Sequence, residues 1–331
     1  MVLTEKELRY LRHEVTEKGS EPWRCQILTV GKIGCNILDR LTSPKFSGAE
    51  SITLGGDVPH LEAIHEIESH VDGRDVVFIL EEVGDEISTD AAVVAEMCKK
   101  KGATVIGVVI IPSRQEKRRI DLALQALTEM KSVADTTMVM DNDKLMNLTP
   151  QPISDAFLAE EMLANTVKSI AETITLPSLM SLSFEDFRAM MEHGNIATLG
   201  TGESDEPNRA ENAAKKAMSQ LLFDVNCRDA DGALIHVSGG GELTLEEAVS
   251  ATASVKAMLD EKALVIWGAR VDPSLGNRLR ITIILTGMQL SQILSGCRLP
   301  EVELFNLEPF AEPEKPLKIE LNLYQMENWE K

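Results

Sequence analysis

The sequence alternates short apolar runs, rich in β-branched residues, with longer segments of helical periodicity. Strands are predicted at 25–30, 76–80, 104–111 and 135–140, and helices between and after them at 61–70, 91–101 and 117–131. Apolar strands separated by helices are typical of a parallel sheet that is covered on both faces. Ligands of such sheets bind beyond the carboxyl ends of the strands, so the loops that line one edge are the first candidates for a site: 31–36, 81–90, 112–116 and 141–144.

A long helical pattern over 153–175 leaves this sheet, and the chain beyond it is organised differently. Helices are predicted there at 184–193, 208–220 and 244–259, and strands at 233–238, 263–268 and 279–286. The predicted fold class is α/β, with a Rossmann-like parallel-sheet domain, a central connecting helix and a smaller α+β second domain. The predicted parts are an N-terminal helix in 1–24, the parallel-sheet domain 25–152, the central helix 153–175, the second domain 176–288 and an acidic, Pro-containing tail 289–331, in which 317–324 could add an edge strand.

The charge of the chain excludes some partners. With 53 acidic and 33 basic residues, its formal net charge is −20, which repels nucleic-acid phosphates and argues against nucleic acid as a main partner. Five scattered cysteines without a C-x-x-C pair fit a reducing compartment and predict neither a disulfide framework nor a metal site. No apolar run approaches about 18 residues, and the start lacks a signal-peptide pattern. We therefore expect a cytoplasmic protein without a transmembrane segment.

Two glycine-rich turns follow predicted strands. The first, GKIGCN at 31–36, carries Gly31 and Gly34, which would let a backbone approach a phosphate closely. It matches neither the dinucleotide fingerprint nor the Walker pattern, so a plain strand–helix turn is the simpler interpretation. The second, SGGGEL at 238–243, precedes a predicted capping box at 244–247 and is interpreted as structural.

The junction between the strand at 76–80 and the helix at 91–101 is unusually acidic. Free N–H groups at such a junction commonly bind an anion, yet this one holds five carboxylates: Glu81, Glu82, Asp85, Glu86 and Asp90. A carboxylate at a helix N-terminus is stabilised by the helix dipole by roughly 0.3–1 kcal/mol. One hypothesis is therefore that the loop caps its own amides and needs no nucleotide. The alternative is a solvated acidic loop on a decayed site.

Several segments keep an order and spacing that are known together from one family. They are DTTMVMDNDKLM (135–146), ITLPSLMSLSFEDFRAMM (174–191), the stretch 193–222, GALIHVSGGGELTLEEA (232–248) and LVIWGARVDPSLGNRLRITIILTG (264–287). In this respect residues 25–288 resemble the FtsZ branch of the FtsZ/tubulin family. The resemblance implies the tubulin/FtsZ fold with a GTPase-type domain. It also implies subunits that stack head to tail, so that a loop of one completes the GTPase site of the next.

The sequence departs from the family in the loops that hold the nucleotide. GDEISTD (84–90) stands where the family has GGGTGTG, so that only Gly84 remains of its five glycines. Each added carboxylate near a triphosphate would cost about 1 kcal/mol in water and about 4 at a partly buried site. The base-recognising asparagine of the central helix is replaced by Glu160, or by Glu161 if the register shifts by one residue.

The catalytic loop is also altered. Ser181 and Ser183 replace the family's asparagine and first aspartate, and Asp186 alone matches. Ser183 and Asp186 also fit an S-x-x-D capping pair, which is the preferred interpretation, so no catalytic residue is expected. If a nucleotide is bound, the resemblance implies these contacts: Gly31, Gly34, Asn36, Gly84, Arg118, Asn142 and Glu160.

Two functions follow. The first is an FtsZ-like cytoskeletal protein, a pseudo-GTPase without a cofactor, that forms filaments or assembles with a protein partner, which could be attached to a membrane. It would act in cell division, cell shape or membrane remodelling. The alternative is a divergent GTP-binding, polymerising GTPase that uses GTP or GDP with Mg²⁺. The sequence leaves open whether the protein is an enzyme and favours a lost GTPase activity. It does not identify a partner.

Overall fold

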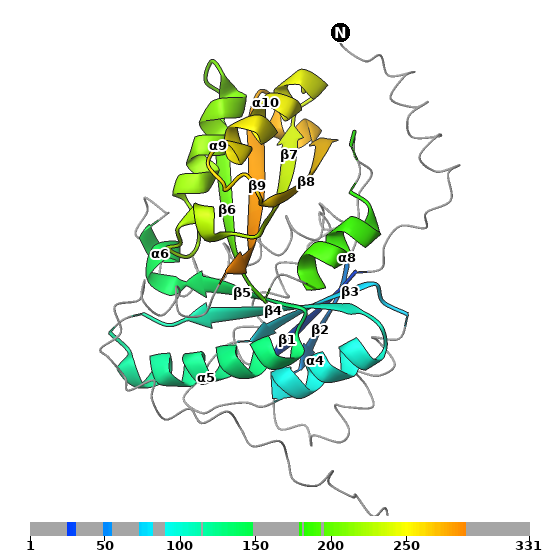
Figure 1. Ribbon diagram of the computed structural model, residues 1–331, viewed down its shortest axis with the longest axis vertical. Coiled ribbons are helices and arrows are strands. Elements are labelled where there is room, and N and C mark those ends of the chain that lie inside the picture. Colours follow the sequence, from blue (N-terminus) through cyan, green and yellow to red (C-terminus); the bar gives the residue numbers. More distant parts are fainter. Residues whose placement is uncertain are drawn as a thin grey trace, which may run out of the picture. The chain divides into compact units, whose positions relative to one another are not determined.

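The computed structural model describes residues 25–30, 49–54, 73–81, 90–113, 115–147, 179–180, 182–192 and 195–288 (Figure 1). The chain divides into two compact units, Met1–Gly296 and Cys297–Lys331, and all described residues belong to the first. The predicted N-terminal helix, the central helix and the tail lie outside the described residues.

The first half of the described chain forms a parallel sheet. Its strands are β1 (Cys25–Val30), β2 (Ala49–Leu54), β3 (Val76–Glu81), β4 (Thr104–Ile111) and β5 (Thr136–Asp141), in the order β2-β1-β3-β4-β5. The four predicted strands are confirmed to within one residue at each end. The strand β2 was not predicted, because AESITL is short and only half apolar.

Both faces of β3, β4 and β5 are buried, as their apolar sequences predicted. The helices α4 (Asp90–Lys100) and α5 (Lys117–Val133) lie side by side along one face of β3, β4 and β5 (Figure 1). Gly107 of β4 makes room there, because a Cβ atom at this position would lie 2.3 Å from Cγ of Met130 on α5. The opposite face packs against α8 (Phe184–Glu192), which buries Phe187, Met190 and Met191.

The second half continues the same sheet. The strand β6 (Asn195–Ser204) pairs in parallel with β5 and then antiparallel with β9 (Leu279–Met288), which is followed by β7 (Gly232–Gly239) and the edge strand β8 (Leu264–Val271). The nine described strands therefore form one mixed sheet, in the order β2-β1-β3-β4-β5-β6-β9-β7-β8. The strand β6 was missed from the sequence because NIATLGTGES contains no apolar run. The other three strands were predicted, although β8 extends to Val271 instead of residue 268.

Small residues let a helix lie close to the second half of the sheet. The helix α9 (Arg209–Ser219) faces β6 with four buried alanines, Ala210, Ala213, Ala214 and Ala217. On the strand, a Cβ at Gly200 or Gly202 would lie 2.2 or 2.3 Å from a backbone oxygen of α9. Beside it runs α10 (Leu245–Lys256), which ends three residues before the predicted boundary because Met258 and Leu259 form a turn.

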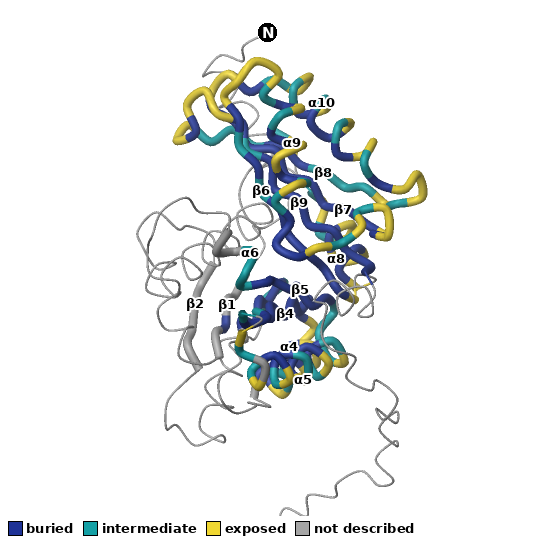
Figure 2. The backbone as a smooth tube through the Cα atoms, turned by 90° about the vertical axis from the view of Figure 1, so that its left-hand side faces the viewer, coloured by how far each residue is buried: buried dark blue, intermediate teal, exposed yellow. Residues whose placement is uncertain are grey.

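One apolar cluster joins the two halves. It takes Phe78 and Met138 from the parallel strands, Phe187 from α8, and Leu234 and Ile284 from the second half, all of them at most 1% exposed. Figure 2 shows β4, β5, β7 and β9 as a mostly buried layer, while α4, α5, α9 and α10 each leave one side exposed. The apolar core is therefore continuous across the junction of β5 and β6.

Candidate functional site

The carboxyl end of β5 carries one of the predicted nucleotide contacts. The strand ends at Asp141, and α6 (Asn142–Asn147) follows without a linker. The Asp141 side chain is 4% exposed, and its Oδ1 accepts a hydrogen bond from the N–H of Asp143 at 2.9 Å. This bond closes a tight turn that holds Asn142, half-buried, at the edge of the sheet where ligands bind in open α/β folds.

Arg118 lies at the same end of the parallel strands, beyond their carboxyl ends. It is exposed in the first turn of α5, which follows β4, the neighbour of β5 in the parallel sheet. The next residue, Arg119, forms an ion pair with Glu116 at 2.7 Å, whereas the Arg118 side chain is exposed to solvent. The structure thus brings Arg118 and Asn142 to one edge of the sheet, as the resemblance implies.

The remaining predicted nucleotide contacts lie outside the described residues: Gly31, Gly34, Asn36, Gly84 and Glu160. The same holds for Asp85 and Glu86 of the acidic loop, although α4 does begin at Asp90. Self-capping by this loop and loss of the nucleotide contacts therefore stay predictions.

The start of α8 has the capping pair that the sequence predicted. Ser183 directly precedes the helix, and its Oγ accepts a hydrogen bond from the N–H of Asp186 at 3.0 Å. The carboxylates of Glu185 and Asp186 are exposed in the first helical turn, where the helix dipole favours negative charge. Ser183 and Asp186 thus have a structural role, whatever else the Asp186 carboxylate does.

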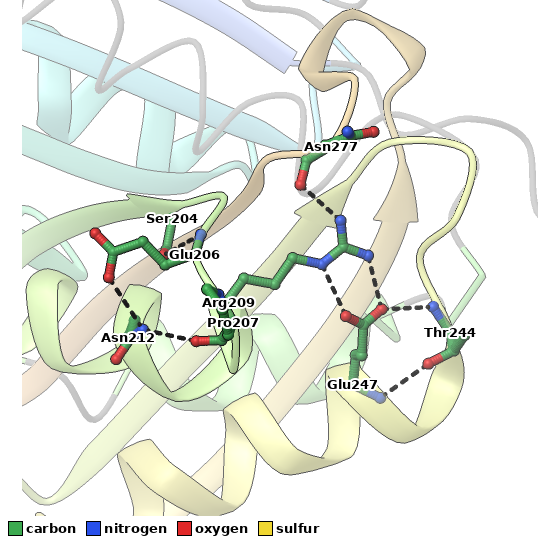
Figure 3. A network of polar contacts seen from close by, with 8 residues as sticks. All are labelled: Ser204, Glu206, Pro207, Arg209, Asn212, Thr244, Glu247 and Asn277. Atoms are coloured by element: carbon green, nitrogen blue, oxygen red, sulfur yellow. Dashed lines mark hydrogen bonds and ion pairs between the residues drawn. The ribbon is translucent and has the colours of Figure 1, made fainter.

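A partly buried ion pair between Arg209 and Glu247 holds three loops of the second half together (Figure 3). We call Arg209, Thr244, Glu247 and Asn277 the second-half clamp. The Arg209 guanidinium donates to both carboxylate oxygens of Glu247, at 2.8 and 2.9 Å, and to the carbonyl oxygen of Asn277 at 2.6 Å. Glu247 and Thr244 bond each other's backbone N–H groups at 3.2 Å. The predicted capping box is therefore confirmed, but Arg209 is 38 residues away from Glu247, and no local pattern indicates it.

The clamp changes the ionisation of its members. Hydrogen bonds from Arg209 hold the pKa of Glu247 below its ordinary value, and Glu247 in turn raises the pKa of Arg209. Only 15% of the Arg209 side chain and 30% of the Glu247 side chain are exposed. The pair therefore stays charged over the physiological pH range.

An open hollow of about 490 Å³ lies over the clamp, between the starts of α9 and α10. Four carboxylates line it, from Glu206, Glu211, Glu246 and Glu247, and its one cation, Arg209, is already bound to Glu247. Because the lining is acidic, the hollow does not suit a phosphate. Apart from the residues that line the hollow, α10 exposes two apolar side chains, Leu245 at 56% and Val249 at 49%.

A histidine that the sequence analysis did not use is buried in the second half of the sheet. His236 of β7 is 4% exposed, and its Nδ1 lies 3.3 Å from Oγ of Ser238. Burial, and after it the charge of Arg270, lowers the pKa of His236 to about 3. The imidazole is therefore neutral and structural at physiological pH.

Among the described residues, no helix is long and apolar enough to cross a membrane. Nor do the described histidines, cysteines and carboxylates gather in threes at any place where they could hold a metal ion.

The comparisons with family models agree with this geometry. Residues 45–150 match the GTPase domain of the tubulin/FtsZ family, and residues 195–289 match the C-terminal domain of the FtsZ family. The matched regions contain the β5–α6 turn and the second-half clamp, respectively.

Individual proteins cover more of the chain. Cell division protein FtsZ 2 of Methanocaldococcus jannaschii is 36% identical over 325 residues, which cover 86% of this chain and 84% of the relative. Cell division protein FtsZ 1 of Thermococcus kodakarensis is 35% identical over 355 residues, covering 96% and 92%. An empty FtsZ dimer from M. jannaschii superimposes with a TM-score of 0.74 at 32% identity, covering 87% of this chain and 93% of that one.

These findings confirm the resemblance and the predicted fold class, with a GTPase half and a C-terminal half on one mixed sheet. They do not test whether the nucleotide loops are degenerate. The chain belongs to the FtsZ family.

Proposed function

We propose that this chain is a self-associating cell-division protein of the FtsZ type. Relatives of 35 and 36% identity, which match most of its length, are cell division proteins. A solved relative of 32% identity is a dimer. The head-to-tail stacking that the resemblance implies needs a complementary surface on each half of the subunit.

The observation that carries this proposal is the exposed apolar pair on α10. Leu245 and Val249 are four residues apart, so they lie on one face of the helix. The capping box and the Arg209–Glu247 pair fix the start of α10, so this face of the helix is held in place before a partner binds. Burying such exposed apolar side chains against a partner is favourable in proportion to the apolar area removed from water.

The proposed function has two versions, which differ in the use of guanine nucleotide. The match of residues 45–150 to the GTPase domain of the tubulin/FtsZ family supports a divergent GTP-binding protein, and so does the position of Arg118 and Asn142 shortly after two neighbouring parallel strands. In that version the subunit binds GTP with Mg²⁺ and assembles with it.

The second version is assembly without nucleotide. Its support is the loop GDEISTD at 84–90, which offers carboxylates where a phosphate-binding loop offers glycine amides. The bond between Ser183 and Asp186 adds to it, because Ser183, which replaces the first aspartate of the family's catalytic loop, accepts the N–H of Asp186 as a helix cap. The solved relative that was described as an empty dimer is consistent with association in the absence of nucleotide.

Self-association is tested by sedimentation and electron microscopy of the purified chain with two charge-introducing variants, Leu245→Glu and Val249→Glu. We expect each to raise the critical concentration about tenfold or more, because a carboxylate replaces a buried apolar contact. The matched control is Val93→Glu on α4, where the valine is 45% exposed in the other half. If all three variants assemble like the natural chain, α10 is not part of the interface.

Nucleotide use is tested separately, by analysing the nucleotide content of the denatured protein and by calorimetric titration with GTP and Mg²⁺. Bound guanine nucleotide or micromolar affinity establishes the first version. Filaments that form without nucleotide, from a chain that binds none at millimolar GTP, establish the second. A chain that stays monomeric under all conditions contradicts both and indicates dependence on a partner protein.

A further inference from the structure

The segment that follows α9 contacts both halves of the sheet. We call Leu221–Asp224 the strap. The N–H of Leu222 donates to the carbonyl of Leu199 on β6 at 2.7 Å, and the N–H of Asp141 at the end of β5 donates to the carbonyl of Leu222 at 2.9 Å. The Leu222 side chain is 3% exposed in the apolar cluster that joins the two halves. The strap therefore lies between the last strand of the GTPase half and the first strand of the other.

One lysine adds a second connection between α6 and the strap. Lys144 Nζ donates to the carbonyl of Leu221 at 3.1 Å and lies 2.5 Å from Oδ1 of Asp224. The Lys144 side chain is 23% exposed, whereas that of Asp224 is 66% exposed. The ammonium group is thus directed to the strap, although the carboxylate it meets is largely in solvent.

The turn that carries Asn142 and Asp143 is consequently held at both of its ends. On one side Asp141 bonds the strap through its backbone N–H, and on the other Lys144 bonds it through its side chain. The bond from the N–H of Asp143 to the Asp141 carboxylate fixes the path between them. The position of this turn at the sheet edge is therefore coupled to the second half of the molecule.

We propose that Lys144 is a positioning residue for assembly, which sets the β5–α6 turn by binding the strap of the other half. This inference rests on the proposed self-association, in which the sheet edge at Asn142 meets the next subunit. Lys144 itself need not touch that subunit. A shift of the strap within the second half would move the turn, and binding at the turn would in the same way favour one position of the strap.

The exposure of the ion pair separates this role from a purely stabilising one. A pair with one partner two-thirds exposed contributes little to stability, because water and salt screen it. Its removal should therefore change the local order of the turn far more than the unfolding of the whole chain. This difference can be measured.

The test compares Lys144→Met, which keeps the aliphatic stem, with Lys144→Arg, which keeps two donors for the strap. The matched control is Lys100→Met, which removes an exposed ion pair with Glu96 on α4. Amide hydrogen exchange of Asp141 and Asp143 is followed in the full chain. We expect exchange about tenfold faster in Lys144→Met and close to the natural rate in Lys144→Arg and Lys100→Met.

Assembly gives the second readout. We expect the critical concentration to rise at least about threefold in Lys144→Met, with the same denaturation midpoint as Lys100→Met. Adding Asp224→Ala to Lys144→Met should change neither measurement further, because the contact is already lost. Unchanged exchange at Asp141 and Asp143 in Lys144→Met would overturn the inference, as would equal assembly of all variants. If the natural chain does not associate, the proposed function fails, and hydrogen exchange still decides whether Lys144 positions the turn.

Discussion

Two charged contacts at the starts of helices hold loops in this molecule, and they differ in construction. The second-half clamp has a two-pronged Arg209–Glu247 pair, mostly buried, whose members bond three loops of one half. The contact of Lys144 with Asp224 is a single pair, two-thirds exposed on the acid side, and it connects one half to the other. The first contact is confined to one half, whereas the second connects the two halves through α6 and the strap.

The backbone packing near the clamp also differs from that near Lys144. Beside the clamp, α9 approaches β6 so closely that only glycine fits at Gly200 and Gly202. At the junction of the halves, β5 and β6 pair over only three residues, Thr136–Met138 with Asn195–Ala197. The strand ladder between the halves is therefore short, and the halves are also held together by the buried apolar cluster that includes Phe78, Phe187 and Ile284.

The largest effect is expected from breaking the close packing of the second half. A Cβ at Gly202 would lie 2.3 Å from both the carbonyl oxygen of Ala213 and the backbone nitrogen of Ala217. Because backbone cannot give way as a side chain can, Gly202→Ala should lower the free energy of unfolding by about 3 kcal/mol or more. Urea denaturation followed by circular dichroism measures the loss.

The control for this prediction is Gly241→Ala, because a Cβ at Gly241 would meet no atom within 4 Å. We expect its free energy of unfolding to stay within about 0.5 kcal/mol of the natural chain. Equal stability of the two alanine variants would show that α9 can move away from β6, and that the second half is not rigid.

The next largest effect is expected from the clamp. Arg209→Met leaves the Glu247 carboxylate, 30% exposed, without its cation, and releases the carbonyl of Asn277. Loss of one member of a fully buried pair costs about 3–5 kcal/mol, and partial exposure reduces this to about 2. The measurement is again urea denaturation.

Arg188→Met is the matched control, since Arg188 pairs with Glu192 on the surface of α8 with 50% of its side chain exposed. Its expected cost is below about 0.5 kcal/mol. A similar cost for both arginine variants would mean that the clamp is no stronger than a surface pair, and the comparison of the two contacts would fail.

Much of the fold could be predicted from the sequence, and the clamp could not. Periodicity gave four parallel strands and five of the described helices, because an apolar run or stripe is a local signal. The sequence of β6 has no apolar run to indicate a strand, because Gly200 and Gly202 stand where α9 packs closely against it. Glu247, the partner of Arg209, is 38 residues away along the chain, and Asp224, the partner of Lys144, is 80 residues away. No local sequence pattern indicates pairs so far apart.

A smaller effect, dependent on pH, is expected from the interior of the second half. His236 has a pKa of about 3 when folded and about 6.5 when unfolded. Between these values the unfolded chain binds one proton more, so stability falls as the pH falls below 6.5. This residue should account for about 1 kcal/mol of the loss between pH 6.5 and about 5.5.

The experiment measures the free energy of unfolding against pH for the natural chain and for His236→Asn. The variant can differ in absolute stability, but its slope between pH 6.5 and about 5.5 should be shallower. Other groups titrate in both proteins alike: the clamp lowers the pKa of Glu247, so its contribution is lost only as the pH falls below the ordinary glutamate value of 4.5. Parallel curves for the two proteins would mean that His236 takes up its proton over the same pH range in the folded and the unfolded chain.

The smallest effect concerns the start of α8, where the matching residue of the catalytic loop lies. Ser183→Ala removes the acceptor for the N–H of Asp186 and should cost about 1 kcal/mol of unfolding free energy. Ser183→Asp keeps an acceptor at the same place and restores the aspartate that the family has there, so its stability should equal that of the natural chain. Thermal denaturation of both variants tests the cap.

Asp186→Asn completes the comparison, because it keeps the backbone N–H that Ser183 binds and removes only the exposed carboxylate. If Asp186 acts only in the cap, assembly and any GTP turnover should be the same as in the natural chain, since the helix dipole loses at most about 1 kcal/mol of favourable charge. A loss of turnover in Asp186→Asn at unchanged stability would instead make this carboxylate functional. It would then tie the start of α8 to the nucleotide edge of a neighbouring subunit, and the assembly would depend on a third contact besides the clamp and Lys144.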